Sequence, residues 1–94
     1  MINIFDSKQV YGGNWEVINS RAFNEEEIAA VLRAEVVPSQ YGSSVCFHMR
    51  GGGMTYIPLS NTSTLQPGDS VDIRKARLLT LHRDGQGDID RVEI

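Results

Sequence analysis

The clearest pattern of apolar and polar positions is an amphipathic stretch from Asn24 to Arg33, which predicts a helix of about ten residues. Asn24 can cap the free backbone amides of the first turn, and Glu27 can complete a capping box. The acidic residues 25–27 match the positive end of the helix dipole and Arg33 the negative end, so we interpret the acidic run as a solvated first turn. One apolar stripe would pack against the rest of the protein: Ile28, Val31 and Leu32.

A hairpin is predicted on either side of the glycine triplet at residues 51–53, with strands from Ser44 to Arg50 and from Met54 to Ser60. If Arg50 pairs with Met54 across a three-residue loop, Phe47 falls opposite Ile57 on one apolar face. A slip of one residue would mix the faces, so we predict the three-residue loop. In that register His48 lies opposite Tyr56 on the other face, together with Cys46, Arg50 and Met54.

The remaining strands are shorter or interrupted. Trp15 to Asn19 predicts one strand, and Glu35 to Val37 predicts another that Pro38 soon ends. A type II turn at Gln66 to Asp69 precedes a long strand from Val71, whose alternation breaks near Ala76 and indicates a bulge or bend. Asp88 to Ile94 reads as an edge strand or a bent closing strand.

This order of elements predicts a mainly β fold, a small five-stranded, partly open barrel with one short N-terminal α-helix. The alternative is an α+β arrangement in which the helix lies across one antiparallel sheet. The chain has 94 residues, of which 40% are hydrophobic, so we expect one domain over residues 1–94, with flexibility only in loops and within residues 1–13.

The cysteine content and the net charge limit the cellular locations and the partners that we expect. The lone Cys46 cannot form an internal disulfide, which favours a reducing, cytoplasmic location. Met1 to Asp6 lacks the basic and apolar regions of a signal peptide, and no apolar run approaches the roughly 18 residues of a membrane span, so we expect no membrane partner. A net charge of −3 argues against binding nucleic acid by bulk electrostatics, and a local patch would be needed.

Motifs for catalysis and metal binding are incomplete. Cys46 and His48 would be half of a zinc site, but His82 has no cysteine partner to complete it. Cys46 as a nucleophile with His48 as its base is disfavoured, because side chains two apart on a strand point the same way without converging. Asp84 to Asp88 lacks the later glutamate of a calcium loop, and residues 51–53 lack the lysine of a phosphate loop. We therefore expect a non-enzymatic protein with no metal or cofactor.

From Glu35 to Ile94 the order of elements resembles the OB-fold of small single-stranded DNA-binding proteins. The resemblance rests on a strand broken at Tyr41 and Gly42, the hairpin of residues 44–50 with 54–59, and the segment 65–71 leading a fourth strand. The helix precedes the first strand, whereas the family places it between the third and fourth. The chain also resembles short uncharacterised proteins of bacterial genomes and mobile elements.

The resemblance implies a ligand on the face of the second and third strands. An aromatic ring there can stack on a base while arginine meets phosphate, so the leading hypothesis is single-stranded nucleic-acid binding. Its candidate residues are Tyr41, His48, Arg50, Tyr56, Arg74 and Arg77. On the alternative interpretation this face only covers a sheet, and the protein is an interaction or assembly module whose edge strand, such as Asp88 to Ile94, pairs with a partner or a second copy.

Overall fold

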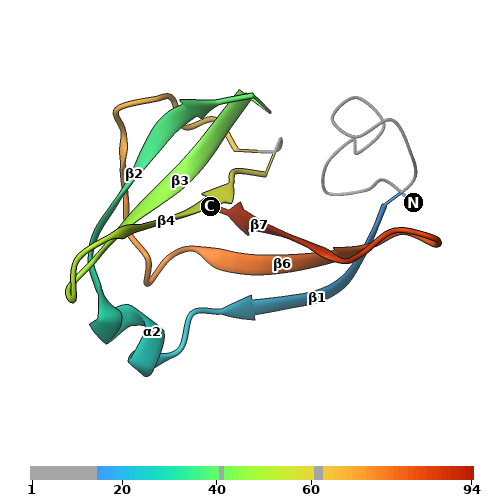
Figure 1. Ribbon diagram of the computed structural model, residues 1–94, viewed down its shortest axis with the longest axis horizontal. Helices are drawn as coiled ribbons and strands as arrows, with labels where there is room; N and C mark the ends of the chain where they lie inside the picture. Colours follow the sequence, from blue (N-terminus) through green and yellow to red (C-terminus); the bar gives the residue numbers. More distant parts are fainter. Residues whose placement is uncertain (1–14, 41, 61–62) are drawn as a thin grey trace.

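Two antiparallel sheets and one short helix make up the part of the chain that the computed structural model describes, residues 15–40, 42–60 and 63–94 (Figure 1). One sheet has the strand order β1-β6-β7 and the other β4-β3-β2-β5. The elements in chain order are β1 (Glu16–Ala22), α2 (Glu25–Ala30), β2 (Val31–Ser39), β3 (Gly42–Met49), β4 (Met54–Pro58), β5 (Ser70–Val71), β6 (Arg77–His82) and β7 (Ile89–Glu93).

Backbone contacts just after β4 join the two sheets. Leu59, just after β4, forms a parallel bridge to Val92 of β7, and the amide of Ser60 donates to the carbonyl of Val92 at 2.7 Å. The prediction of a mainly β fold is confirmed. The sheets do not close into a barrel, so the five-stranded OB-like barrel is not confirmed, and two sheets stand where the α+β alternative expected one. No helix in the described ranges is long and apolar enough to cross a membrane.

Helix α2 begins where the sequence predicts and ends earlier. The capping box is present, with the Glu27 amide donating to Asn24 Oδ1 at 2.7 Å and the Asn24 amide donating to Glu27 Oε1 at 3.0 Å. The predicted end at Arg33 is wrong, because Val31 is already extended and pairs with β3. The last carbonyls of the helix are instead capped by Arg50, whose amide donates to Ala30 and whose Nε donates to Ala29, at 3.0 and 2.8 Å.

Strand β2 continues through Pro38, which the sequence analysis expected to interrupt it. Pro38 pairs with Ser43, and the ladder extends to Ser39 opposite Gly42. The backbone groups of Val36 point away from β3, toward the segment before β5: its amide donates to the Asp69 carbonyl, and its carbonyl accepts from the Gly68 amide. Pro38 lies two residues further along the strand, so its backbone groups point to the same side. Because proline's missing N–H falls on that side, where β5 does not reach, the β2–β3 ladder stays complete.

The β3–β4 hairpin has a different register from the predicted one. His48 pairs with Met54, so the register is displaced by two residues from the predicted Arg50–Met54 pair, and Tyr56 lies opposite Cys46 rather than His48. The predicted Arg50–Met54 pair is therefore wrong, and the last ladder bond, from the Met49 amide to the Gly53 carbonyl, leaves residues 50–52 in the loop. A shift of two residues keeps every side chain on the face that alternation assigned to it, because the side-chain period of a strand is two.

The chain changes sheets where the sequence indicated a break near Ala76. The predicted long strand is two strands, β5 and β6, separated by a turn in which the Lys75 amide donates to the Asp72 carbonyl at 2.9 Å. The preceding type II turn is supported by the bond from the Asp69 amide to the Gln66 carbonyl and by a φ of +99° at Gly68.

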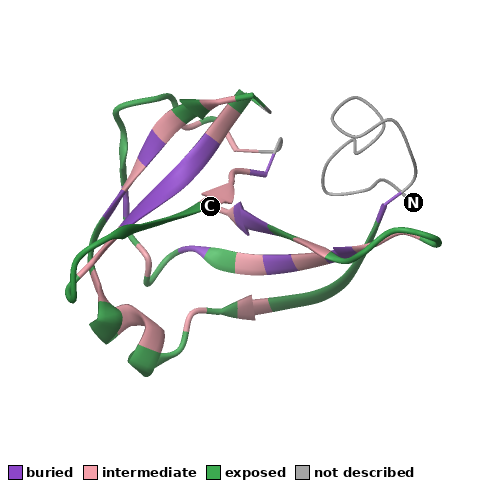
Figure 2. Ribbon diagram, viewed as in Figure 1, coloured by how far each residue is buried: buried purple, intermediate pink, exposed green. Residues whose placement is uncertain are grey.

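Two hydrophobic clusters hold the sheets together, and their buried residues are among those drawn in purple in Figure 2. The larger lies against sheet β4-β3-β2-β5 and also takes in Ala76 and Val92: Ala34, Val36, Val45, Phe47, Val71, Ala76 and Val92. The smaller comprises Trp15, Leu79 and Leu81 with the partly buried Ile89. Ile89 and Val92 of β7 thus belong to different clusters on opposite faces of their sheet. This explains why these two apolar residues are three positions apart and do not alternate with a period of two.

Candidate functional site

A linked set of polar side chains lies on the outer face of the larger sheet, opposite the hydrophobic cluster. His48 Nε2 lies 2.5 Å from Glu35 Oε2 and 3.6 Å from Cys46 Sγ, and Arg33 Nη1 lies 2.7 Å from the same Glu35 oxygen. Pairing of Glu35 with Cys46 and of Arg33 with His48 across β2 and β3 places these groups side by side. The hydrogen bond with His48, and then that with Arg33, holds the pKa of Glu35 below its usual value.

Tyr56 and Met54 continue this face onto β4, and both side chains are 55% exposed. Tyr56 stands opposite the buried Cys46, and its hydroxyl donates to Met54 Sδ at 3.6 Å. A hydrogen bond with the Cys46 thiol raises the pKa of Tyr56. At neutral pH Tyr56 is therefore a neutral, amphipathic ring at the margin of the sheet.

The side chains of Cys46 and His48 approach each other, contrary to the expectation from strand alternation that they do not converge. However, Cys46 and Glu35 both contact the same nitrogen of His48, whereas a nucleophile and an orienting carboxylate in a triad engage opposite ring nitrogens. Cys46 is also only 2% exposed. Among the described residues, no group of three or more His, Cys, Asp or Glu side chains could hold a metal ion.

The predicted nucleic-acid residues do not gather on one surface. His48 and Tyr56 share the outer face, as alternation indicated. Arg50 lies in the turn after β3 and points its Nε to helix α2, so its predicted place beside His48 is wrong. Arg74 is in the turn between β5 and β6, and Arg77 opens β6 in the other sheet. Tyr41 lies outside the described residues.

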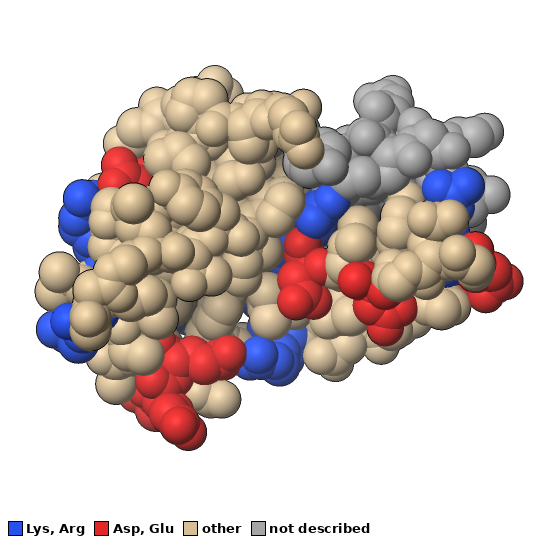
Figure 3. Space-filling view, viewed as in Figure 1, with Lys and Arg blue, Asp and Glu red and all other residues tan. Residues whose placement is uncertain are grey.

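Most of these arginines are held by groups of the same chain. Arg74 binds both oxygens of Glu25 at 2.9 and 3.2 Å, and Arg77 donates to the hydroxyl and the carbonyl of Ser20. Arg21 binds both oxygens of Glu27. Acidic side chains gather at the lower left of Figure 3, where Figure 1 places α2. A phosphate would have to displace the carboxylate held by Arg74 or Arg21, or the Ser20 oxygens held by Arg77, so these arginines form no open cationic track.

Strand β4 offers an open backbone edge. It pairs only with β3 among the described residues, and it ends its sheet. The bonds Met49 N to Gly53 O and Leu59 N to Ser43 O show that the odd-numbered residues make the ladder with β3. The even-numbered residues of β4 therefore turn their backbone groups away from β3, Met54 and Tyr56 to the open side and Pro58 toward β7, which joins the chain at residues 59 and 60.

The other strand edges are less open or less regular. The predicted edge at Asp88 to Ile94 contains β7, which borders its sheet but receives the bridge and hydrogen bond from residues 59 and 60. Strand β1 exposes Val17 and Ile18, but a register shift between Val17 and Asn19 interrupts its ladder. Such a bulge twists an edge away from further pairing. β5 has two residues.

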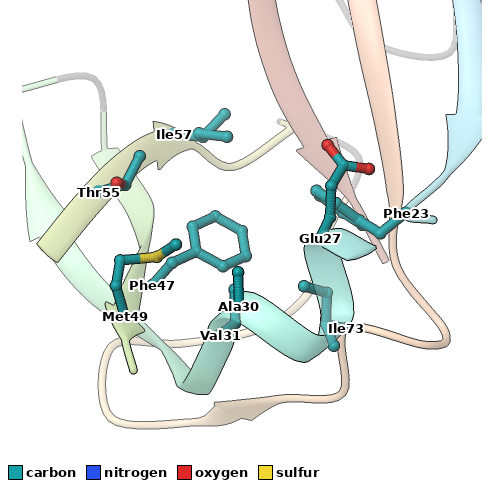
Figure 4. A pocket seen from close by; sticks show the side chains of 9 residues that line it. All are labelled: Phe23, Glu27, Ala30, Val31, Phe47, Met49, Thr55, Ile57 and Ile73. Carbon is teal, nitrogen blue, oxygen red and sulfur yellow. The ribbon is translucent and has the colours of Figure 1, made fainter. Parts of the chain in front are cut away.

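A pocket adjoins the open edge on the inner face of the sheet (Figure 4). Phe47 and Met49 of β3 and Thr55 and Ile57 of β4 form one side. Helix α2 and the chain on either side of it form the other, with Ile73 completing the lining: Phe23, Glu27, Ala30 and Val31. The rings of Phe23 and Phe47 lie 5.8 Å apart at an interplanar angle of 53°.

Two features that set this site are not predictable from the sequence pattern. Glu35, which contacts the outward His48, and Arg33, which binds Glu35, come from a strand whose start the pattern predicts as helix. The open edge of β4 depends on strand order, which periodicity does not reveal. No family model matches this chain, and neither the curated protein sequences nor the solved structures contain a match to it.

Proposed function

We propose that this protein is a non-enzymatic binding module that pairs an extended segment of a partner protein with strand β4. The observation that carries the proposal is the open edge of β4, where Met54 and Tyr56 each present an N–H and a carbonyl away from β3. An added strand satisfies such groups through main-chain hydrogen bonds, which supply affinity without requiring a particular sequence. The sequence pointed instead to the edge at Asp88 to Ile94, where β7 receives the bridge and hydrogen bond from residues 59 and 60, whereas Met54 and Tyr56 precede that contact.

The surroundings of β4 suit this mode of binding. Tyr56 and Met54 flank the edge on the outer face with exposed apolar surface, and tyrosine and methionine are enriched in interfaces. On the inner face, Thr55 and Ile57 border a pocket. An extended segment beside β4 would thus meet side-chain contacts on both of its faces.

Single-stranded nucleic-acid binding is the second candidate, and one observation favours it. The exposed ring of Tyr56 lies on the same face as His48, so a base could stack there, as the OB-fold resemblance of the sequence implies. The engagement of Arg74 with Glu25 and of Arg77 with Ser20 weighs against it, because phosphate contacts supply most of the affinity for single strands.

The test separates backbone pairing from side-chain contact at one position. Tyr56→Pro removes an outward N–H and leaves the β3 ladder intact, as Pro58 of the same parity already does. Tyr56→Ala is the matched control, which removes the ring and keeps the N–H. A random seven-residue peptide library displayed on phage is selected against the protein. Binding of a fluorescein-labelled synthetic copy of a selected peptide is then measured by anisotropy.

We expect Tyr56→Pro to weaken binding about tenfold, since a backbone hydrogen bond is lost and its partner is left unsatisfied, and Tyr56→Ala to weaken it less. A peptide N-methylated at the facing residue should show the same loss with the unchanged protein. The proposal would be overturned if the proline variant, and the unchanged protein with the methylated peptide, both bound as tightly as the unchanged protein binds the unmethylated peptide. Failure to select any peptide, with saturable and salt-dependent binding of labelled oligothymidylate, would replace it with the second candidate.

A further inference from the structure

The pocket beside β4 has the size of one side chain. Its volume is about 200 Å³. Pockets for drug-sized ligands begin at about 300 Å³, whereas an engineered cavity of about 150 Å³ in another protein binds benzene. Phe23, Phe47, Met49 and Ile57 give it apolar walls, with Thr55 and Glu27 as its polar members. The pocket thus fits a phenyl ring or a branched aliphatic group.

The position of the pocket matches the alternation of an added strand. Thr55 and Ile57 bond to β3 through their backbones, and their side chains line the pocket. In an antiparallel pair, residues directly opposite each other project to the same face. A segment that pairs with β4 through Met54 and Tyr56 therefore directs the side chain opposite Thr55 or Ile57 toward the pocket.

Charged residues at the rim of the pocket favour one kind of partner residue beside the inserted side chain. Arg21 neutralises Glu27 and Arg74 neutralises Glu25, but Glu26 forms no ion pair with any described residue. Residues four apart are neighbours on a helix surface, so Glu26 lies beside Ala30, which lines the pocket. Arg50, the cation beside Ala30, directs its Nε to the Ala29 carbonyl at the negative end of the helix dipole, and the whole chain carries a net charge of −3. A basic residue next to the inserted side chain is therefore favoured over an acidic one.

We infer that the pocket between α2 and β4 is a specificity pocket that receives one apolar side chain, phenylalanine or leucine, flanked by lysine or arginine in an extended partner segment. The inference rests on the proposed function, because the segment is held in register by β4. The main chain of the partner supplies its attachment, and this single side chain distinguishes one partner from another.

The experiment uses two neighbouring alanines of α2. Both are exposed, but only Ala30 lines the pocket, so Ala30→Leu fills it and Ala29→Leu is the matched control. The probes are synthetic copies of a selected peptide with alanine, leucine, phenylalanine or tryptophan at the pocket position, flanked by lysine or by glutamate. Toluene is a second probe that needs no peptide, read as a rise in melting temperature.

With the unchanged protein and with Ala29→Leu, we expect the phenylalanine peptide to bind roughly tenfold tighter than the alanine peptide, from burial of the ring. Tryptophan should bind more weakly than phenylalanine, and glutamate flanks should weaken binding. Ala30→Leu should remove both the preference for phenylalanine and the stabilisation by toluene. If peptides bind in a Tyr56-dependent way but all side chains bind equally, the inference fails and the proposed function survives. If toluene stabilises the protein through Ala30 but no peptide binds, the proposed function fails.

Discussion

Arg21, near the end of β1, binds both carboxylate oxygens of Glu27 in the first turn of α2, at 2.6 and 2.9 Å. The pair connects one sheet to the helix that walls the pocket. The hydrogen bond from Arg21, followed by that from the Asn24 amide, lowers the pKa of Glu27 from 4.5 to about 2. Because the pKa of Glu27 is lower in the folded state, its carboxylate stabilises the fold at pH values above 4.5, the ordinary pKa of the group. This contribution is lost as pH falls from 4.5 toward 2.

We therefore expect Glu27→Gln to be less stable than the unchanged protein at neutral pH, and the difference to shrink as the pH is lowered below 4.5. Urea unfolding midpoints across this range measure it. Glu26→Gln is the control, because Glu26 has no ion pair among the described residues. A difference for Glu27→Gln that stays constant down to the lowest accessible pH would show that Arg21 does not act through the charge of Glu27.

The cap of α2 gives a second prediction. Asn24 Oδ1 accepts the Glu27 amide at 2.7 Å, and this acceptor is lost in Asn24→Ala. We expect a loss of about 1 kcal/mol in the free energy of unfolding, the usual cost of removing an N-cap side chain. Asn24→Ser keeps an oxygen acceptor and should retain most of the stability. Chemical denaturation of both variants tests this, and equal stability of the alanine and serine variants would contradict a capping role.

The start of α2 was predictable because its signals are local. Asn24 and Glu27 satisfy each other within one turn, whatever lies around them. The end of α2 depends on residues far along the chain: Val31 is drawn into pairing with Met49, and Arg50 caps the freed carbonyls. The apolar stripe through Val31 is therefore equally compatible with a longer helix and with the start of a strand.

The same distinction applies to the candidate site. Alternation placed His48 and Tyr56 on one face correctly, because a two-residue error in register does not change a face. Arg50 and Arg74 lie in turns, where alternation has no meaning, and their partners come from α2. The open edge of β4 follows from strand order, which no local pattern of this sequence specifies.

His82 gives a prediction with the opposite pH dependence. Its Nδ1 lies 2.8 Å from Asp88 and its Nε2 3.3 Å from Asp84, and these hydrogen bonds, that with Asp88 first, raise the pKa of His82 above 6.5. The stabilisation is complete below 6.5 and is lost as pH rises through the raised value. His82→Gln should therefore differ most from the unchanged protein in mildly acidic solution and least in alkaline solution.

Proton NMR titration of the imidazole measures the same effect directly. Asp88→Asn should lower the pKa of His82 toward its ordinary value, and Asp84→Asn should lower it less, since the Asp84 contact is longer. Asp72→Asn, whose side chain accepts from the Arg74 amide, should leave it unchanged. A pKa at or below 6.5 in the unchanged protein would refute the pairing of His82 with both carboxylates.

The glycines of the β3–β4 turn give the last prediction, because they set which backbone groups of β4 face outward. Gly52 has a φ of +96° and its amide donates to the Met49 carbonyl at 3.0 Å, whereas Gly51 is not among the glycines with positive φ. An alanine at either position meets no atom within 4 Å, so only backbone conformation separates them. We expect Gly52→Ala to cost about 1 kcal/mol of unfolding free energy, and Gly51→Ala to be neutral or stabilising by up to about 1 kcal/mol, because it reduces the freedom of the unfolded chain. Denaturation midpoints of the two variants make the comparison. If Gly52→Ala were as stable as Gly51→Ala, the turn at residues 50–52, and with it the outward direction of the Tyr56 amide, would have to be abandoned.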